Sequence, residues 1–103
     1  MTKIYRYEVP IDDELHKIDL YDAPMLTMSV KPHANPHPEF GYIQGDASVS
    51  FWAFAHLEKG PGAVTSHEFR VYGTGQEIPD GSIYWGTVAS ASGFVWHLIE
   101  ENA

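Results

Sequence analysis

Hydrophobic and polar positions alternate along much of this chain. In the segment KIYRYEV, Tyr5, Tyr7 and Val9 fall on one face of an extended chain and the intervening residues on the other. A period of two is typical of β-strands. The same alternation recurs in HKIDLY, MLTMSVK and HEFRVY, and the segments SIYWGTV and GFVWHLI indicate a terminal strand pair. We therefore expect a series of short strands, the last two of them joined by the small-residue turn ASASG.

The segment ASVSFWAFAHLE departs from simple alternation. Apolar residues occupy one parity at Val49, Phe51, Ala53, Ala55 and Leu57, and also the other at Trp52 and Phe54. This pattern favours a central strand that is covered on both faces.

Turn residues interrupt the alternation about every ten residues, as in antiparallel sheets. Pro32, Pro36 and Pro38 fall close together, and they predict a loop, an insertion at about 32–46. No segment has convincing helical periodicity. The alternating segments and the turn spacing together predict an all-β fold for this chain of 103 residues. We expect residues 1–103 to form a single domain, an antiparallel sandwich or partly open barrel of about seven short strands.

Charge and composition argue against two classes of function, nucleic-acid binding and membrane insertion. Fourteen acidic residues face six basic ones, which gives a net charge of −8. This charge repels the phosphate backbone, so we expect no direct nucleic-acid binding. An acidic surface either keeps the protein soluble or docks on a basic surface of another protein. The chain has no cysteine, no apolar run of the ~18 residues that cross a bilayer and no signal-like N-terminus. We therefore expect a cytoplasmic protein that does not enter the membrane.

The Gly73-Thr74-Gly75 segment allows two interpretations. A dinucleotide fingerprint needs a third glycine, but position 78 is isoleucine, and no Gly-Lys-Ser/Thr of a P-loop follows. We therefore expect a reversal between strands, in which both glycines are free to take positive φ. Asp80 and Gly81 then make the next turn. The alternative is that backbone amides of residues 73–75 bind an anion.

Candidate chemistry is sparse, and we expect no catalytic residue, no metal and no cofactor. His33 and His37 lie in the proline-rich loop, where i,i+4 spacing does not make ligands converge. The other four histidines, His16, His56, His67 and His97, fall in predicted strands, where they satisfy their hydrogen bonds on a sheet face. The run Asp12-Asp13-Glu14 lacks the spacing of a calcium loop and reads as a solvated turn. No serine occupies a G-x-S-x-G elbow.

The aromatic residues point weakly to binding. Seven thin strands cannot cover all of them, so we expect some of Trp52, Tyr72 and Tyr84 to reach the surface. Together with the loop Gly73, Thr74 and Gly75, these three form the candidate binding residues.

Three stretches carry a resemblance. YRYEVPIDDE, HEFRVYGTGQEIPD and the terminal YWGTV with FVWHLIE resemble a family of short uncharacterised phage and bacterial proteins with VPIDDE, FRVxGTGxxIPD and GTV motifs. The match covers both ends of the chain but not residues 32–46. The resemblance implies a phage or mobile-element origin and a compact β-rich domain, and it supplies no catalytic residues.

Two hypotheses for function follow, with an uncharacterised enzyme as a distant third. The first is an acidic phage-type interaction protein that docks on a host protein and inhibits a host defence protein through its basic surface. The second is a small-ligand module that sequesters a nucleotide-like molecule between aromatic faces. The six cations of the chain are few for a phosphate ligand, which favours the first. Neither the partner nor the oligomeric state follows from the sequence.

Overall fold

The fold is an open antiparallel β-sandwich. The computed structural model describes residues 1–103 except 26–27, 33–35, 38–40, 43–45, 92 and 102–103. One sheet has three strands in the order β1 (Thr2–Pro10), β6 (Asp46–His56) and β3 (Met28–Pro32). The other has four, in the order β2 (His16–Leu20), β7 (Thr65–Gly73), β9 (Val95–Glu100) and β8 (Ile83–Ala89). The prediction of an all-β antiparallel sandwich is confirmed, and the sheets do not close into a barrel.

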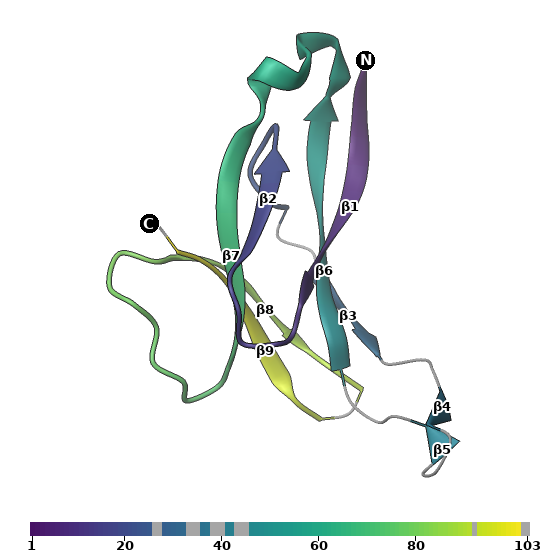
Figure 1. The fold of residues 1–103 in the computed structure, drawn as a ribbon, viewed down its shortest axis with the longest axis vertical. Helices are drawn as coiled ribbons and strands as arrows, with labels where there is room; N and C mark the ends of the chain where they lie inside the picture. The colour runs from purple at the N-terminus through teal and green to yellow at the C-terminus, as the bar shows by residue number, and fades with distance from the viewer. Residues whose placement is uncertain (26–27, 33–35, 38–40, 43–45, 92, 102–103) are drawn as a thin grey trace.

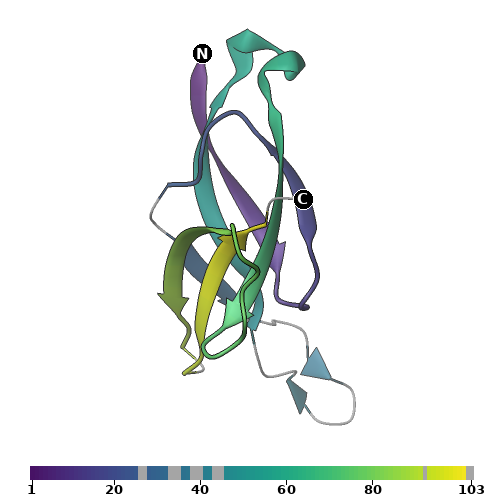
Figure 2. The ribbon, with the colours of Figure 1, turned by 90° about the vertical axis from the view of Figure 1, so that its left-hand side faces the viewer.

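The two sheets face each other across an apolar core. Figures 1 and 2 show β6 and β1 in one layer and β7 and β2 in the other. Phe51 of β6 and Phe69 of β7 meet in the middle, with ring centroids 5.2 Å apart. Fully buried aliphatic residues from both sheets surround them, namely Val9, Leu20, Val49 and Leu98. The alternation in the sequence therefore fixes which face of each strand turns inward.

The central strand β6 is covered on one face only. Its odd-numbered residues from Val49 to Ala55 are fully buried, as predicted. On the other face Trp52 is half-buried and Phe54 is 43% exposed. Leu57 lies beyond the strand, in the 3₁₀ helix η1 (Leu57–Lys59), and is exposed. The prediction of cover on both faces is wrong here, because a two-layer sandwich leaves the outer face of each sheet to the solvent.

The connections carry the turn chemistry that the sequence indicates. Two 3₁₀ helices, η1 and η2 (Pro61–Ala63), join β6 to β7 at the end where the N-terminus lies. The turn between β8 and β9 is closed by a hydrogen bond from the Ser90 amide to the Phe94 carbonyl, 2.8 Å. No helix in the described part of the chain is long and apolar enough to cross a membrane.

The proline-rich segment contains a short strand pair. β4 (Pro36–His37) pairs with β5 (Gly41–Tyr42) as a separate two-stranded sheet. Pro32 and Asp46, at the limits of the predicted insertion, are still paired between β3 and β6. The excursion from the sandwich therefore lies between these two residues, and its other residues fall outside the described ranges.

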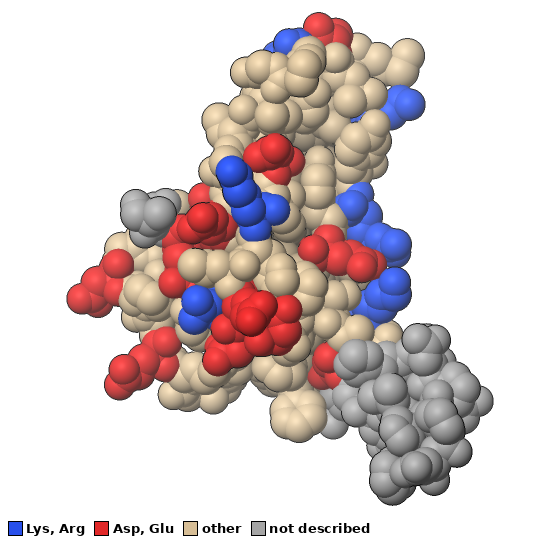
Figure 3. All heavy atoms as spheres, in the orientation of Figure 1, with Lys and Arg blue, Asp and Glu red and all other residues tan. Residues whose placement is uncertain are grey.

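Charge is unevenly distributed over the fold. In Figure 3 acidic groups gather over the β1–β2 turn and the β7–β8 loop, while several basic groups line the edge beside β1 and β3. Strands β1, β3 and β6 hold Lys3, Arg6 and Lys31 against Glu8 and Asp46, a net charge of +1. Because the whole chain carries −8, the remainder carries −9.

Candidate functional site

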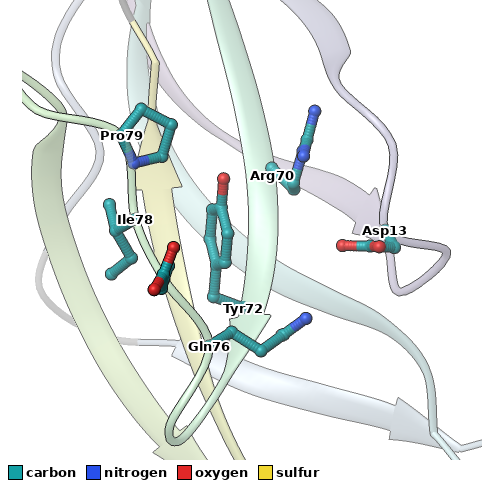
Figure 4. A pocket seen from close by; sticks show the side chains of 7 residues that line it. Asp13, Arg70, Tyr72, Gln76, Ile78 and Pro79 are labelled. Atoms are coloured by element: carbon teal, nitrogen blue, oxygen red, sulfur yellow. The ribbon is translucent and has the colours of Figure 1, made fainter.

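The loop between β7 and β8 covers part of the outer face of its own sheet. Tyr72 lies opposite His97 in the ladder and points away from the inter-sheet core, yet it is only 3% exposed. Ile78 and Pro79 of the loop lie beside its ring (Figure 4). The sequence suggested that Tyr72 could reach the surface. Tyr72 is not among the aromatic residues that do so, because the loop folds back over the strand that precedes it.

An open pocket of about 500 Å³ lies at this place. We call it the Arg70–Tyr72 pocket, and its lining residues are Asp13, Arg70, Tyr72, Gln76, Glu77, Ile78 and Pro79. Figure 4 shows Tyr72 in the middle, with Ile78 and Pro79 on one side and Arg70 and Asp13 on the other. Three segments thus build the pocket: the β1–β2 turn, β7 and the β7–β8 loop.

The positive charge of Arg70, which lines the pocket, is neutralised by the carboxylate of Glu101. Arg70 Nε lies 3.2 Å from Glu101 Oε2, close enough for an ion pair although not aligned for a hydrogen bond. The Tyr72 hydroxyl donates to the same carboxylate oxygen at 2.9 Å. The Arg70 guanidinium also lies 5.8 Å from the centroid of the Tyr72 ring, within cation–π range. Burial, followed by the hydrogen bond to Glu101, raises the pKa of Tyr72.

The β1–β2 turn forms an acidic rim of the pocket. The Glu14 amide donates to Asp12 Oδ1 at 3.1 Å, and His16 Nε2 lies 2.8 Å from the same oxygen. The hydrogen bond from His16 lowers the pKa of Asp12. Asp13 has a φ of 60°, a left-handed conformation that Asp tolerates better than most residues. The prediction of a turn at residues 12–14 is confirmed, and within it Asp13 lines the pocket.

The Gly73-Thr74-Gly75 segment begins the covering loop. The Gln76 amide donates to the Gly73 carbonyl at 3.2 Å, which closes a turn with Gly75 at a φ of 95°. The expectation of positive φ is right for Gly75 and wrong for Gly73, since Gly73 still belongs to β7 and pairs with Trp96. The turn does not lead to a neighbouring strand, because β9 lies between β7 and β8. The Gly73 amide donates to the Gln76 side chain.

Two of the predicted binding residues belong to a hydroxyl network on the same outer face. His97 Nε2 lies 2.9 Å from Thr74 Oγ1, and His97 Nδ1 lies 2.8 Å from Thr87 Oγ1. The Tyr84 hydroxyl forms a hydrogen bond with Thr87 Oγ1, and the Tyr84 residue is 61% exposed. Tyr84 therefore reaches the surface, as expected for some of the three aromatic candidates.

A second, more apolar pocket of about 520 Å³ lies between the turn that begins at Gly73 and the β8–β9 turn. We call it the Phe94 pocket, and it is lined by Gly73, Thr74, Gly93, Phe94, Val95 and Trp96. Phe94 is 58% exposed, and its ring centroid lies 5.8 Å from that of Trp96. A hydrogen bond holds the Trp96 ring in place, because its indole Nε1 donates to Asp46 Oδ2 at 2.7 Å.

The predicted binding residues do not form one site. Tyr72 lines the Arg70–Tyr72 pocket, and Gly73 and Thr74 line the Phe94 pocket. Gly75 serves the turn between them, and Trp52 lies on the other sheet. Sequence reasoning missed the charged residues of the first pocket, chiefly Asp13, Arg70, Glu77 and Glu101. No short-range spacing links them, since the fold brings them together from distant parts of the chain.

The histidines in strands are satisfied, as predicted. His16 bonds Asp12, His97 bonds two threonines, and His56 bonds Thr2 and Asp22. His67 Nδ1 lies 2.7 Å from Glu100 Oε2, and the other oxygen of Glu100 accepts from Trp85 Nε1 at 2.9 Å. Among the residues that the structure describes, no three His, Asp or Glu side chains are grouped to hold a metal ion. His33 and the side chain of His37 lie outside those residues.

Comparison with known proteins gives a family and nothing about chemistry. No curated protein and no solved structure matches the chain. One family model matches it over residues 1–103. The chain therefore belongs to the family described as Domain of unknown function (DUF7352).

Proposed function

We propose that this chain is a small protein-interaction domain that docks its acidic face on a basic surface of a partner protein. One observation carries the proposal: a pocket opens where two acidic loops meet, with Asp13 from one loop and Glu77 from the other in its lining. A pocket within a patch of one charge sign is a natural place for a complementary partner to anchor.

The charge distribution supports this proposal. The exposed residues Asp12, Asp13, Glu14, Glu77 and Asp80 all belong to the two loops that border the pocket. A field of one sign over such a face speeds the encounter with an oppositely charged surface. The same field repels phosphates, so the proposal excludes direct binding of nucleic acid.

The finer form of the proposal concerns origin and partner. The motifs of the sequence resemble phage proteins, so we propose that the partner is a protein of the bacterial host and that the chain acts in the host cytoplasm. A defence nuclease with a basic groove has the complementary chemistry. In this role the chain inhibits by occupying the groove and performs no catalysis itself.

A capture experiment tests this function. The chain is immobilised and exposed to lysate of the bacterial host at low and at moderate salt, and each bound protein is identified, purified and bound again. We expect a partner with a basic surface that binds directly at low salt and more weakly at moderate salt. A purified partner whose binding ignores salt, or no direct binder at either salt, would contradict the proposal.

The Phe94 pocket favours a second function, the binding of a small aromatic ligand such as a nucleotide base. It combines an exposed Phe94 ring with the Thr74 hydroxyl and a mostly apolar lining. Flat rings stack on exposed aromatic side chains. A thermal-shift screen of nucleosides and nucleotides tests it, with Phe94→Ala as the variant that should lose any shift. A ligand whose shift survives in Phe94→Ala would exclude this pocket.

A further inference from the structure

We infer that the Arg70–Tyr72 pocket accepts a single lysine or arginine side chain of the partner. This inference rests on the proposed function and adds the chemical group that enters the site. It follows from the charge balance, the shape and the free carboxylates of the pocket.

The charge balance favours a cation. Among the described residues that line the pocket, Arg70 is the one basic residue, and its charge is offset by Glu101 at 3.2 Å. Asp13 and Glu77 remain, so the pocket with Glu101 carries a formal charge of −2. An anion would have to compete with Glu101 for Arg70 while facing two further carboxylates. A cation, by contrast, is attracted by the carboxylates of both Asp13 and Glu77.

The two rim carboxylates are available to a ligand. Within the described part of the chain, neither Asp13 nor Glu77 makes a hydrogen bond or an ion pair through its side chain, and both residues are exposed. Asp12 and Glu101, by contrast, are held by His16 and by Arg70 with Tyr72. The carboxylates free to accept a ligand are therefore those of Asp13 and Glu77, and not those of Asp12 and Glu101, which maintain the structure.

The shape suits a long side chain with an apolar stem. Ile78 and Pro79 lie beside the Tyr72 ring and offer an apolar wall, and the carboxylates of Asp13 and Glu77 belong to the same lining. Lysine and arginine bury their methylene stems along apolar surface and keep the charged head near polar groups. The volume of about 500 Å³ leaves room for one such side chain.

Amide-resolved NMR titration tests the inference without the partner. The probes are N-acetyl-arginine amide and N-acetyl-lysine amide, with N-acetyl-citrulline amide as the neutral control of arginine shape. We expect saturable shifts at the amides of Asp13 and of residues 76–78, from the arginine probe, the lysine probe or both, and none from citrulline. The two basic probes decide which head group fits better.

Paired variants locate the binding. Asp13→Asn keeps a residue that tolerates positive φ, and with Glu77→Gln it removes two charges from the rim. The control of equal charge, Glu8→Gln with Glu58→Gln, removes two ion-paired carboxylates from β1 and η1, outside the pocket. We expect the rim pair to weaken probe binding by about two- to fivefold per carboxylate, the range of an exposed charge pair, and the control pair to leave it unchanged.

The inference fails if neither basic probe shifts these amides, if citrulline shifts them equally, or if both variant pairs weaken binding alike. Each of these results leaves the proposed function intact, because the capture experiment does not depend on free amino acid amides. Conversely, a protein that binds the basic probes at this pocket but captures no partner would retain the site and lose the proposed function.

Discussion

The Tyr72 hydroxyl donates a hydrogen bond to Glu101 Oε2 at 2.9 Å, and this contact joins the outer face of β7 to the residue that follows β9. The same oxygen pairs with Arg70. Glu101 is itself fixed, because its amide donates to the Glu68 carbonyl at 2.9 Å. Glu101 therefore holds Tyr72 in place and offsets the charge of Arg70, the only cation among the described residues that line the pocket.

Tyr72→Phe should destabilise the fold by about 1.5–3 kcal/mol at neutral pH, since it removes a hydrogen bond to a charged group. The pKa of Tyr72 is raised above the usual 10.0 of a tyrosine, first by burial. The native state therefore favours the protonated phenol. Its contribution to stability is fully present below pH 10.0 and is lost as the pH rises through the folded pKa. Urea unfolding at neutral and alkaline pH measures both effects.

The variant should accordingly lose less stability than the wild type between neutral and alkaline pH. A wild type and a Tyr72→Phe variant with the same alkaline loss would show that Tyr72 does not titrate as this environment requires.

Phe51→Ala and Phe54→Ala make a matched pair on one strand. Phe51 is fully buried against Phe69, whereas Phe54 lies on the outer face and is 43% exposed. We expect Phe51→Ala to cost about 3–5 kcal/mol through lost burial and a cavity. Phe54→Ala should cost well under half as much. Chemical denaturation of both variants checks the orientation of β6, and equal losses would contradict it.

Gly75→Ala should destabilise the fold by about 1 kcal/mol, because Gly75 has a φ of 95°. Gly73→Ala should cost less, since Gly73 has no positive φ and an added Cβ would lie 3.4 Å from the Gln76 side-chain oxygen and 3.6 Å from Trp96. Thermal melts of the two variants give the order. A larger loss for Gly73→Ala would overturn the assignment of the turn.

Asp12 should titrate below its usual range because of its hydrogen bond to His16. Its pKa is lowered from 3.8, and His16 is the largest cause. Its stabilising effect is therefore present above 3.8 and is lost as the pH falls through the lowered folded value. Carbon NMR titration of the side-chain carboxyl should show the low pKa, and His16→Ala should return it toward 3.8. An unchanged value in His16→Ala would disprove the cause.

The sequence predicts the fold well because burial imposes period two on strands such as β7, where Phe69 and Val71 alternate with Glu68 and Arg70. The sequence does not predict the place where the β7–β8 loop covers the outer face of its own sheet. Nothing local to Tyr72 indicates that Ile78 and Pro79 fold back over it. The strand order adds to the difficulty, because β9 inserts between β7 and β8 although β8 comes first in the chain.

The site was less predictable than the fold, for a related reason. Arg70 looks like an ordinary outward residue of an alternating strand, and Asp13 like one member of a solvated acidic turn. Only the pairing of β2 with β7, in which His16 lies opposite Phe69, brings that turn beside Arg70. The aromatic candidates Trp52 and Tyr84 follow from the limited cover that seven thin strands provide, which does not indicate their neighbours, and the fold places them on different sheets.

The affinity of a purified partner for two charge-matched variants tests the central claim most directly. Calorimetry compares the wild type, the rim pair Asp13→Asn with Glu77→Gln, and the control pair Glu8→Gln with Glu58→Gln, at low and moderate salt. We predict that the rim pair binds about tenfold more weakly, as two lost charge contacts require, while the control pair binds like the wild type. Equal losses in both pairs, or no loss in the rim pair, would contradict docking through this pocket.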